Sequence, residues 1–240
     1  MGRRPAQLSF PAPRTWGGSR RGAGRKPTPG RRPGVPHRAR PPHTAAHPVH
    51  VTLRATAAVR CLRADRVFPA VRRALAAASR EGFRIIEFSA QDDHLHLLVE
   101  AEDGARLSRG IAGLAIRVAR AVNGALGRLG AVWSDRYHAR AVTTPRALRH
   151  TIVYILLNRR KHARGEQGLD TCSSARWFTG WRDGPVPAPT ERSPVVRART
   201  WLAAVGWRMH GLIGFHEQPR TGGLSRGASA RPRSPRPLRQ

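Results

Sequence analysis

Residues 94–99 constrain the fold more than any other stretch of the chain, because their side chains alternate as those of a half-buried β-strand do. One face of such a strand is aliphatic and suits a core: Leu95, Leu97 and Val99. The other face carries His94 and His96 with Leu98, and the two histidines are about 6.5 Å apart along the strand. Residues 91–93 are all that separates this strand from an apolar run at 83–90, so the sequence predicts an antiparallel hairpin.

The two histidines have two interpretations. Two imidazoles at this spacing can bind one divalent ion, and the preceding Asp92 and Asp93 are close enough to hydrogen-bond a ring N–H. Alternatively, the histidines lie at the wet edge of a half-buried strand and bind nothing. This stretch alone leaves both interpretations open.

The charge of the chain restricts its partners. The 240 residues carry a formal net charge of +30, which favours a polyanion, and nucleic acid is the expected one. No apolar run approaches the length of a membrane span, and the first residues lack the apolar core of a signal peptide, so we expect no membrane association and a cytoplasmic location. Cys61 and Cys172 are the only cysteines, too few for a disulfide framework.

Composition divides the chain into four parts. Residues 1–48 contain ten arginines, one lysine and no acidic residue among many prolines and glycines, which predicts a disordered basic arm. The arm is interpreted either as a segment that binds DNA phosphates or as a solvated tail. We expect a folded domain at 49–181, a C-terminal extension at 182–217 with a short helix within 195–207, and a second disordered basic tail at 218–240.

Hydrophobic periodicity predicts strands and helices in the folded part. Strands are expected at 50–54, 83–90, 94–99 and 132–142. Helices are expected from Phe68 to a stop at Gly82, between Gly104 and Gly127, and from Pro145 through Lys161, with Thr143 and Thr144 as the cap of the last helix. We therefore expect an α/β sandwich, in which an antiparallel sheet carries helices on its faces.

The helix expected to begin at Pro145 has a polar stripe. The stripe repeats every fourth residue: His150, Tyr154, Asn158 and His162. The opposite side is apolar: Leu148, Ile152, Ile155 and Leu156. A lone tyrosine on such a helix is usually a core residue with its hydroxyl at the rim. Tyr154 is not alone, because Asn158 shares its face.

The order of these motifs resembles a known family. A His-Leu-His strand, a long helix, a Trp133-x-x-Arg136-Tyr137 strand and a helix bearing Tyr154-Ile155-x-x-Asn158 follow one another as in the HUH single-strand DNA nucleases. The pattern is most similar to the single-tyrosine transposases, in particular the REP-associated and IS200-like ones, over about residues 48–181. The resemblance implies a ferredoxin-like α+β fold.

The resemblance also implies a site. His94 and His96 match the metal-binding pair, Asn158 matches the amide that completes the metal site, and Tyr154 matches the nucleophile. The implied cofactor is Mg²⁺ or Mn²⁺. Arg159 departs from the family, in which proline often follows the asparagine, so the helix is expected to run on through Lys161. The residues expected to bind DNA are Arg136, Arg140, Arg159 and Lys161.

The implied activity is cleavage and rejoining of single-stranded or hairpin DNA through a 5′-phosphotyrosine intermediate, by a monomer or a homodimer. A phenolate is a good leaving group, so the covalent bond to DNA is reversible and joining is possible. Two alternatives stay open. One is a non-catalytic, domesticated DNA-binding protein, and the other is a metal-dependent phosphoester hydrolase that uses activated water.

Overall fold

The computed structural model of the chain describes residues 42–162, 168–187 and 189–219. The disorder expected for most of the two basic tails, at 1–41 and 220–240, lies outside these residues, and so does the side chain of Lys161. The last residues of the expected arm lie against the sheet: Nε2 of His43 is 2.8 Å from the carbonyl oxygen of Ala101, and the Val142 N–H donates to the Pro48 carbonyl. Among the described helices, none is long and apolar enough to cross a membrane.

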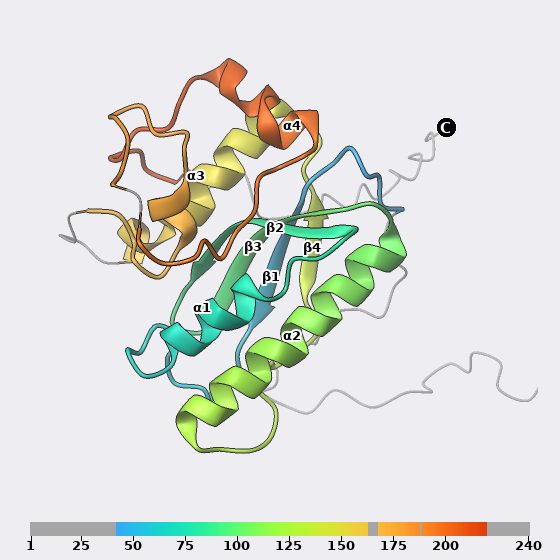
Figure 1. The fold of residues 1–240 in the computed structure, drawn as a ribbon, viewed down its shortest axis with the longest axis vertical. Helices are drawn as coiled ribbons and strands as arrows, with labels where there is room; N and C mark the ends of the chain where they lie inside the picture. The colour runs from blue at the N-terminus through green and yellow to red at the C-terminus, as the bar shows by residue number, and fades with distance from the viewer. Residues whose placement is uncertain (1–41, 163–167, 188, 220–240) are drawn as a thin grey trace, which may run out of the picture. The chain divides into compact units, whose positions relative to one another are not determined.

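The core of the fold is a four-stranded antiparallel sheet with the strand order β2-β3-β1-β4 (Figure 1). The strands and helices, in chain order, are β1 (Val49–Arg54), α1 (Phe68–Ala76), β2 (Phe83–Ala90), β3 (His94–Ala101), α2 (Gly104–Leu126), β4 (His138–Ala141) and α3 (Pro145–His162). The βαββαβ order with this arrangement of strands is ferredoxin-like, which confirms the expected fold class.

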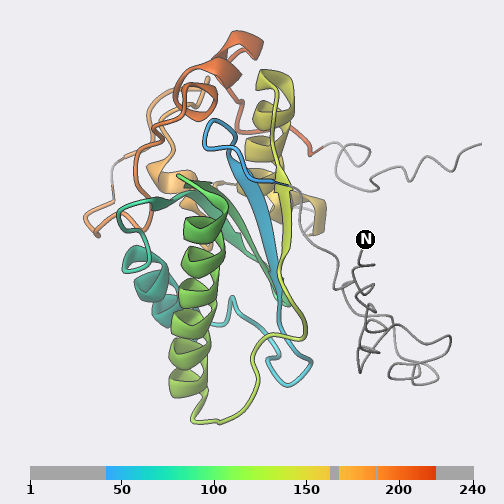
Figure 2. The same cartoon turned by 90° about the vertical axis from the view of Figure 1, so that its right-hand side faces the viewer.

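The sheet lies between two helical layers (Figures 1 and 2). The alternation of β3 explains the division, since Leu95, Leu97 and Val99 pack in the core beneath α1 and α2, whereas Leu98 packs in the core beneath α3. The hairpin predicted between β2 and β3 is confirmed. His96, on the same face as Leu98, is therefore buried under the α3 layer.

Two predicted elements are shorter than expected. Helix α1 ends at Ala76 rather than at Gly82, because residues after it turn back to β2: Arg80 and Phe83 exchange backbone hydrogen bonds, and Gly82 has φ 74°. Strand β4 covers His138–Ala141 rather than 132–142. Trp133 pairs only as an isolated bridge, and its indole N–H donates to the Ala115 carbonyl of α2.

The C-terminal extension has a short helix within the expected range 195–207, but the helix covers only part of that range. The helical residues are α4 (Trp201–Ala204) and the 3₁₀ turn η2 (Gly206–His210). Residues before Trp201 instead follow the sheet: the Val196 N–H donates to the Ile85 carbonyl, and the buried Glu100 carboxylate accepts the backbone N–H groups of Arg199 and Thr200. The C-terminal extension then packs on α3, with Leu202, Trp207 and Ile213 in the same core.

Candidate active site

Helix α3 crosses the face of β3 that carries the histidines. The hydroxyl oxygen of Tyr154 lies 3.5 Å from Nε2 of His96, and the two rings are 5.0 Å apart between centroids. The rings of His94 and His96 are 4.5 Å apart. The structure thus brings together three residues that the sequence singled out for chemistry.

The two tyrosines of the chain are in different environments. Tyr137 packs against the core beneath α1 and α2. Tyr154 is half-buried beside the histidines on the opposite face, and burial raises the pKa of its phenol. Tyr154 is therefore the tyrosine whose hydroxyl faces the histidine pair.

Two residues of β1 support His96, and sequence reasoning missed both. The register of β1 and β3 places Thr52 opposite His96, and Oγ1 of Thr52 is 3.1 Å from Nδ1 of His96. Nε2 of His50 lies 3.3 Å from the same Nδ1. Burial, and then the charge of Arg140, lower the pKa of His50 to about 4, so His50 is neutral at pH 7. These contacts at Nδ1 leave Nε2 of His96 directed toward Tyr154.

His94 is oriented by the residue before it. Nδ1 of His94 is 2.5 Å from Oδ1 of Asp93, whose other oxygen accepts from Arg54. The hydrogen bond with His94 lowers the pKa of the Asp93 carboxyl, so the carboxylate is ionised at neutral pH. Asp93 thus fulfils the expected supporting role. Asp92 does not, because it accepts from Cys61 and lies 3.9 Å from Arg159.

Asn158 follows Tyr154 by one helical turn and is 1% exposed. Neither the nitrogen nor the oxygen of its carboxamide has a hydrogen-bond partner. A buried amide without partners is costly, so this orphaned group needs an explanation. In the described part of the chain, no group of three His, Cys, Asp or Glu side chains is placed to hold a metal ion. Two imidazoles and an amide oxygen nevertheless form a donor set that suits a divalent ion.

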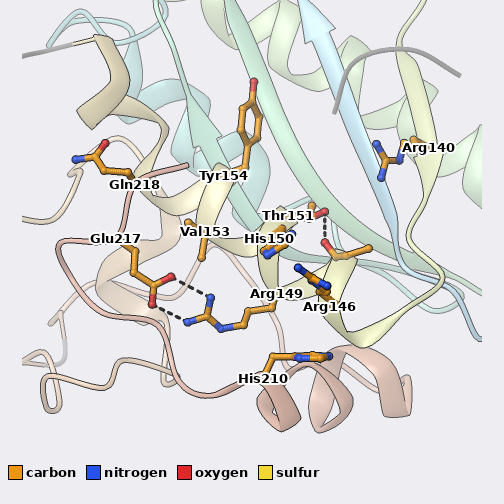
Figure 3. A pocket seen from close by; sticks show the side chains of 11 residues that line it. Arg140, Arg146, Arg149, His150, Thr151, Val153, Tyr154, His210, Glu217 and Gln218 are labelled. Carbon is orange, nitrogen blue, oxygen red and sulfur yellow. Dashed lines mark hydrogen bonds and ion pairs between the residues drawn. The ribbon is translucent and has the colours of Figure 1, made fainter. Parts of the chain in front are cut away.

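The basic residues expected to bind DNA are spread around this site. Arg140 is exposed on β4, where it pairs with His50 of β1, and Arg136 is exposed in the turn before β4. Arg159 approaches Asp92 at the hairpin turn. Beside Tyr154 opens a pocket of about 510 Å³ (Figure 3). The lining residues are Arg140, Arg146, Ala147, Arg149, His150, Thr151, Val153, Tyr154, His210, Glu217 and Gln218.

Comparison with known families assigns this domain. Residues 45–156 match the family model described as "Transposase IS200 like", a span that includes His94, His96 and Tyr154 and ends before Asn158. The matched part of the folded domain thus resembles a transposase domain. More narrowly, this part of the chain is similar to the IS200-like transposases. No curated protein matches the chain.

Two solved structures are similar to the chain. One is a REP-associated tyrosine transposase bound to a REP hairpin; it is 19% identical, with a TM-score of 0.49, over 68% of this chain and 98% of that one. The other is a Deinococcus radiodurans R1 protein assigned as a transposase; it is also 19% identical, with a TM-score of 0.35, over 40% of this chain and 78% of that one. At these values neither structure assigns a role to a residue of this chain.

Proposed function

We propose that the chain is a divalent-metal-dependent transposase that cleaves and rejoins single-stranded or hairpin DNA, with Tyr154 as the nucleophile. The observation that carries the proposal is the 3.5 Å separation of the Tyr154 hydroxyl from Nε2 of His96. The match to the IS200-like family model supports the reaction class, and the net charge of +30 suits a DNA substrate. The enzyme is proposed to act in the cytoplasm, as a monomer or a homodimer.

Tyr154 performs the exchange of one phosphodiester for another. Its hydroxyl oxygen forms a bond to the scissile phosphorus while the bond from phosphorus to the 3′-oxygen breaks. The phenol loses its proton, the 3′-oxygen leaves as a hydroxyl, and the protein stays on the 5′-phosphate. Because burial raises the pKa of Tyr154, the phenol is protonated until it reacts. The 3′-hydroxyl of another strand reverses the step and joins the DNA.

The residues around Tyr154 fit a hard divalent ion, Mg²⁺ or Mn²⁺. His94, His96 and Asn158 would hold it, and the bound ion would supply charge stabilisation at the non-bridging phosphate oxygens. Asp93 holds the ring of His94, while Thr52 and His50 hold the ring of His96. The proposed DNA contacts outside the site are Arg136, Arg140, Arg159 and Lys161.

An adduct assay tests the proposal. Hairpin oligonucleotides with unpaired flanks, labelled at either the 5′ or the 3′ end, are incubated with the protein and Mg²⁺ and separated under denaturing conditions. We expect a covalent protein–DNA adduct that carries the 3′ label, and we expect Tyr154→Phe to abolish it. Tyr137→Phe is the matched control, because it removes the other hydroxyl from the opposite face of the sheet.

Other outcomes identify the alternatives. Cleaved DNA without an adduct would indicate a hydrolase that uses activated water, and salt-sensitive binding without cleavage would indicate a DNA-binding protein. An adduct that survives Tyr154→Phe and is lost in Tyr137→Phe would show that the nucleophile has been misassigned.

A further inference from the structure

The pocket beside Tyr154 lies along the N-terminal half of α3. Arg146, His150 and Tyr154 occur at intervals of four residues and therefore share one line of the helix surface, which continues to Asn158. Figure 3 shows the Tyr154 hydroxyl pointing away from the pocket's cluster of Arg149, Glu217 and His210. Tyr154 thus stands between two sites, with its hydroxyl toward His96 and its ring along the pocket.

Charge in the pocket is positive. Arg140, Arg146 and Arg149 line it, and among the described lining residues Glu217 is the one acidic group. Glu217 is neutralised within the wall, since its two carboxylate oxygens accept from the Arg149 guanidinium at 2.6 and 2.9 Å. Burial raises the pKa of Glu217, but the bonds from Arg149 and the Gly214 N–H outweigh burial and lower it. With three arginines and one glutamate, the described lining keeps a net positive charge.

Arg149 and Arg146 differ in the contacts that they make in the pocket. Arg149 also donates to the carbonyls of Gly211 and Leu212, so it fastens the C-terminal extension to α3 and builds the wall. Arg146 is exposed in the first turn of α3 and makes no hydrogen bond or ion pair with any described residue. Its guanidinium is available for a phosphate, which arginine binds through paired, charge-assisted hydrogen bonds.

The size of the pocket restricts the ligand. A volume of about 510 Å³ is that of a small-molecule site, which suits a nucleotide or two but not a duplex. Single-stranded DNA is bound by basic grooves in which aromatic rings lie beside the backbone, and here the Tyr154 ring borders the groove. The ligand that matches charge, size and position is an unpaired strand.

We infer that this pocket binds the unpaired nucleotides on one side of the scissile phosphate, with Arg146 as a phosphate ligand. The inference rests on the proposed function, because it places the scissile phosphate at Tyr154. In this arrangement the pocket holds the flanking strand, and the next phosphate along that strand reaches the Tyr154 hydroxyl. The contact with phosphate makes this part of recognition independent of base sequence.

Equilibrium binding tests the inference without any need for cleavage. Four labelled hairpins are compared: one with roughly six unpaired nucleotides on both sides, one without the 5′ flank, one without the 3′ flank, and one without either. We expect Arg146→Gln to weaken binding of the fully flanked hairpin roughly tenfold and to lower the salt slope by about 0.7, the value for one single-strand phosphate. The pocket is expected to bind one of the two flanks. Removal of that flank should abolish the difference in affinity between Arg146→Gln and the native protein, and removal of the other flank should not.

Matched variants separate the pocket from the general charge of the protein. Arg117→Gln removes an exposed arginine of α2, in the layer on the other side of the sheet, and we expect a change of less than twofold. Arg146→Lys keeps the charge and should recover much of the lost affinity. Equal losses for Arg146→Gln and Arg117→Gln, or a loss that persists with the hairpin that lacks both flanks, would overturn the inference. Absence of the Tyr154 adduct, with flank-dependent binding intact, would instead refute the proposed function alone.

Discussion

The two faces of the sheet are built from the same strands but differ in chemistry. The face beneath α1 and α2 is a continuous apolar core. The face beneath α3 buries polar groups, among them Glu87, Ser89, His96 and Asn158. Buried polar groups reduce stability unless they are well paired, so a face that holds several of them is adapted to something other than stability. The comparison indicates that the first face holds the fold together, while the second holds the polar groups of the proposed site.

Among the substitutions that test this difference between the faces, Glu87→Gln should change the free energy of unfolding most. Glu87 is buried on β2 with its carboxyl 2.5 Å from the Ser174 hydroxyl, and burial raises its pKa from 4.5 to about 8 despite that hydrogen bond. Between these values the folded protein keeps a proton that the unfolded chain has lost, so its stability falls as the pH rises. Glu87→Gln removes this penalty.

We therefore expect the stability advantage of Glu87→Gln to grow by about 1.4 kcal/mol per pH unit above about pH 4.5 and to level off near pH 8, for a total of roughly 5 kcal/mol. Urea unfolding at several pH values measures it, with Glu102→Gln at an exposed position as the control. A difference that does not vary with pH would mean that Glu87 is ionised in the folded protein.

Leu97 tests the apolar face. Its side chain is fully buried beneath α1 and α2, and Leu97→Ala should lower the free energy of unfolding by about 3 kcal/mol. Because Leu97 points away from α3, Tyr154 adduct formation should persist at temperatures where the variant is folded. Chemical denaturation and the adduct assay measure the two properties, and loss of adduct formation by fully folded Leu97→Ala would show that the faces are not separable.

Asn158 offers the converse test on the polar face. Asn158→Leu replaces an orphaned buried amide with an apolar group, so we expect the metal-free protein to gain about 2 kcal/mol of stability. The same change should weaken Mn²⁺ binding, measured by calorimetry. If stability falls and Mn²⁺ affinity is unchanged, the amide has a structural partner and is no ligand.

The smallest effect should come from Thr52. Thr52→Val keeps the shape of the side chain but removes the hydroxyl near Nδ1 of His96. Loss of such a supporting contact typically weakens metal binding about tenfold, and we expect that loss for Mn²⁺ with little change in the unfolding midpoint. Thr52→Ser should restore affinity. An unaltered affinity in Thr52→Val would mean that the Thr52 hydroxyl does not support the His96 ring.

Local patterns were enough to predict most elements and part of the site. The alternation of residues 94–99 gave the hairpin strand and its two faces, and Thr144 caps α3 as expected, with Oγ1 accepting from the Ala147 N–H. His50 and Thr52 could be assigned to the polar side of a strand, but their approach to His96 depends on the register of β1 against β3. Register between distant strands is set by tertiary packing, which no local pattern encodes.

The limits of the short helix in the C-terminal extension could not be predicted for the same reason. Its short helix begins where Thr200 caps it and where Glu100, on β3, accepts the preceding backbone N–H groups. The amino-acid sequence from Pro194 to Trp207 does not indicate that a distant carboxylate will bind these backbone groups. The pocket could not be predicted either, because Arg146 and Glu217 are far apart in the sequence and line the same pocket only in the folded protein.

The bridge between Arg149 and Glu217 has a consequence for biosynthesis. The strands and the two helices of the apolar face are complete once residue 141 has been made, whereas the wall of the pocket needs Glu217, which the ribosome makes later. Domains form in the order in which the ribosome releases their parts. The nascent protein therefore acquires its scaffold early and its finished pocket last, so a chain that stalls before residue 217 presents Tyr154 without the surface that encloses the pocket beside it.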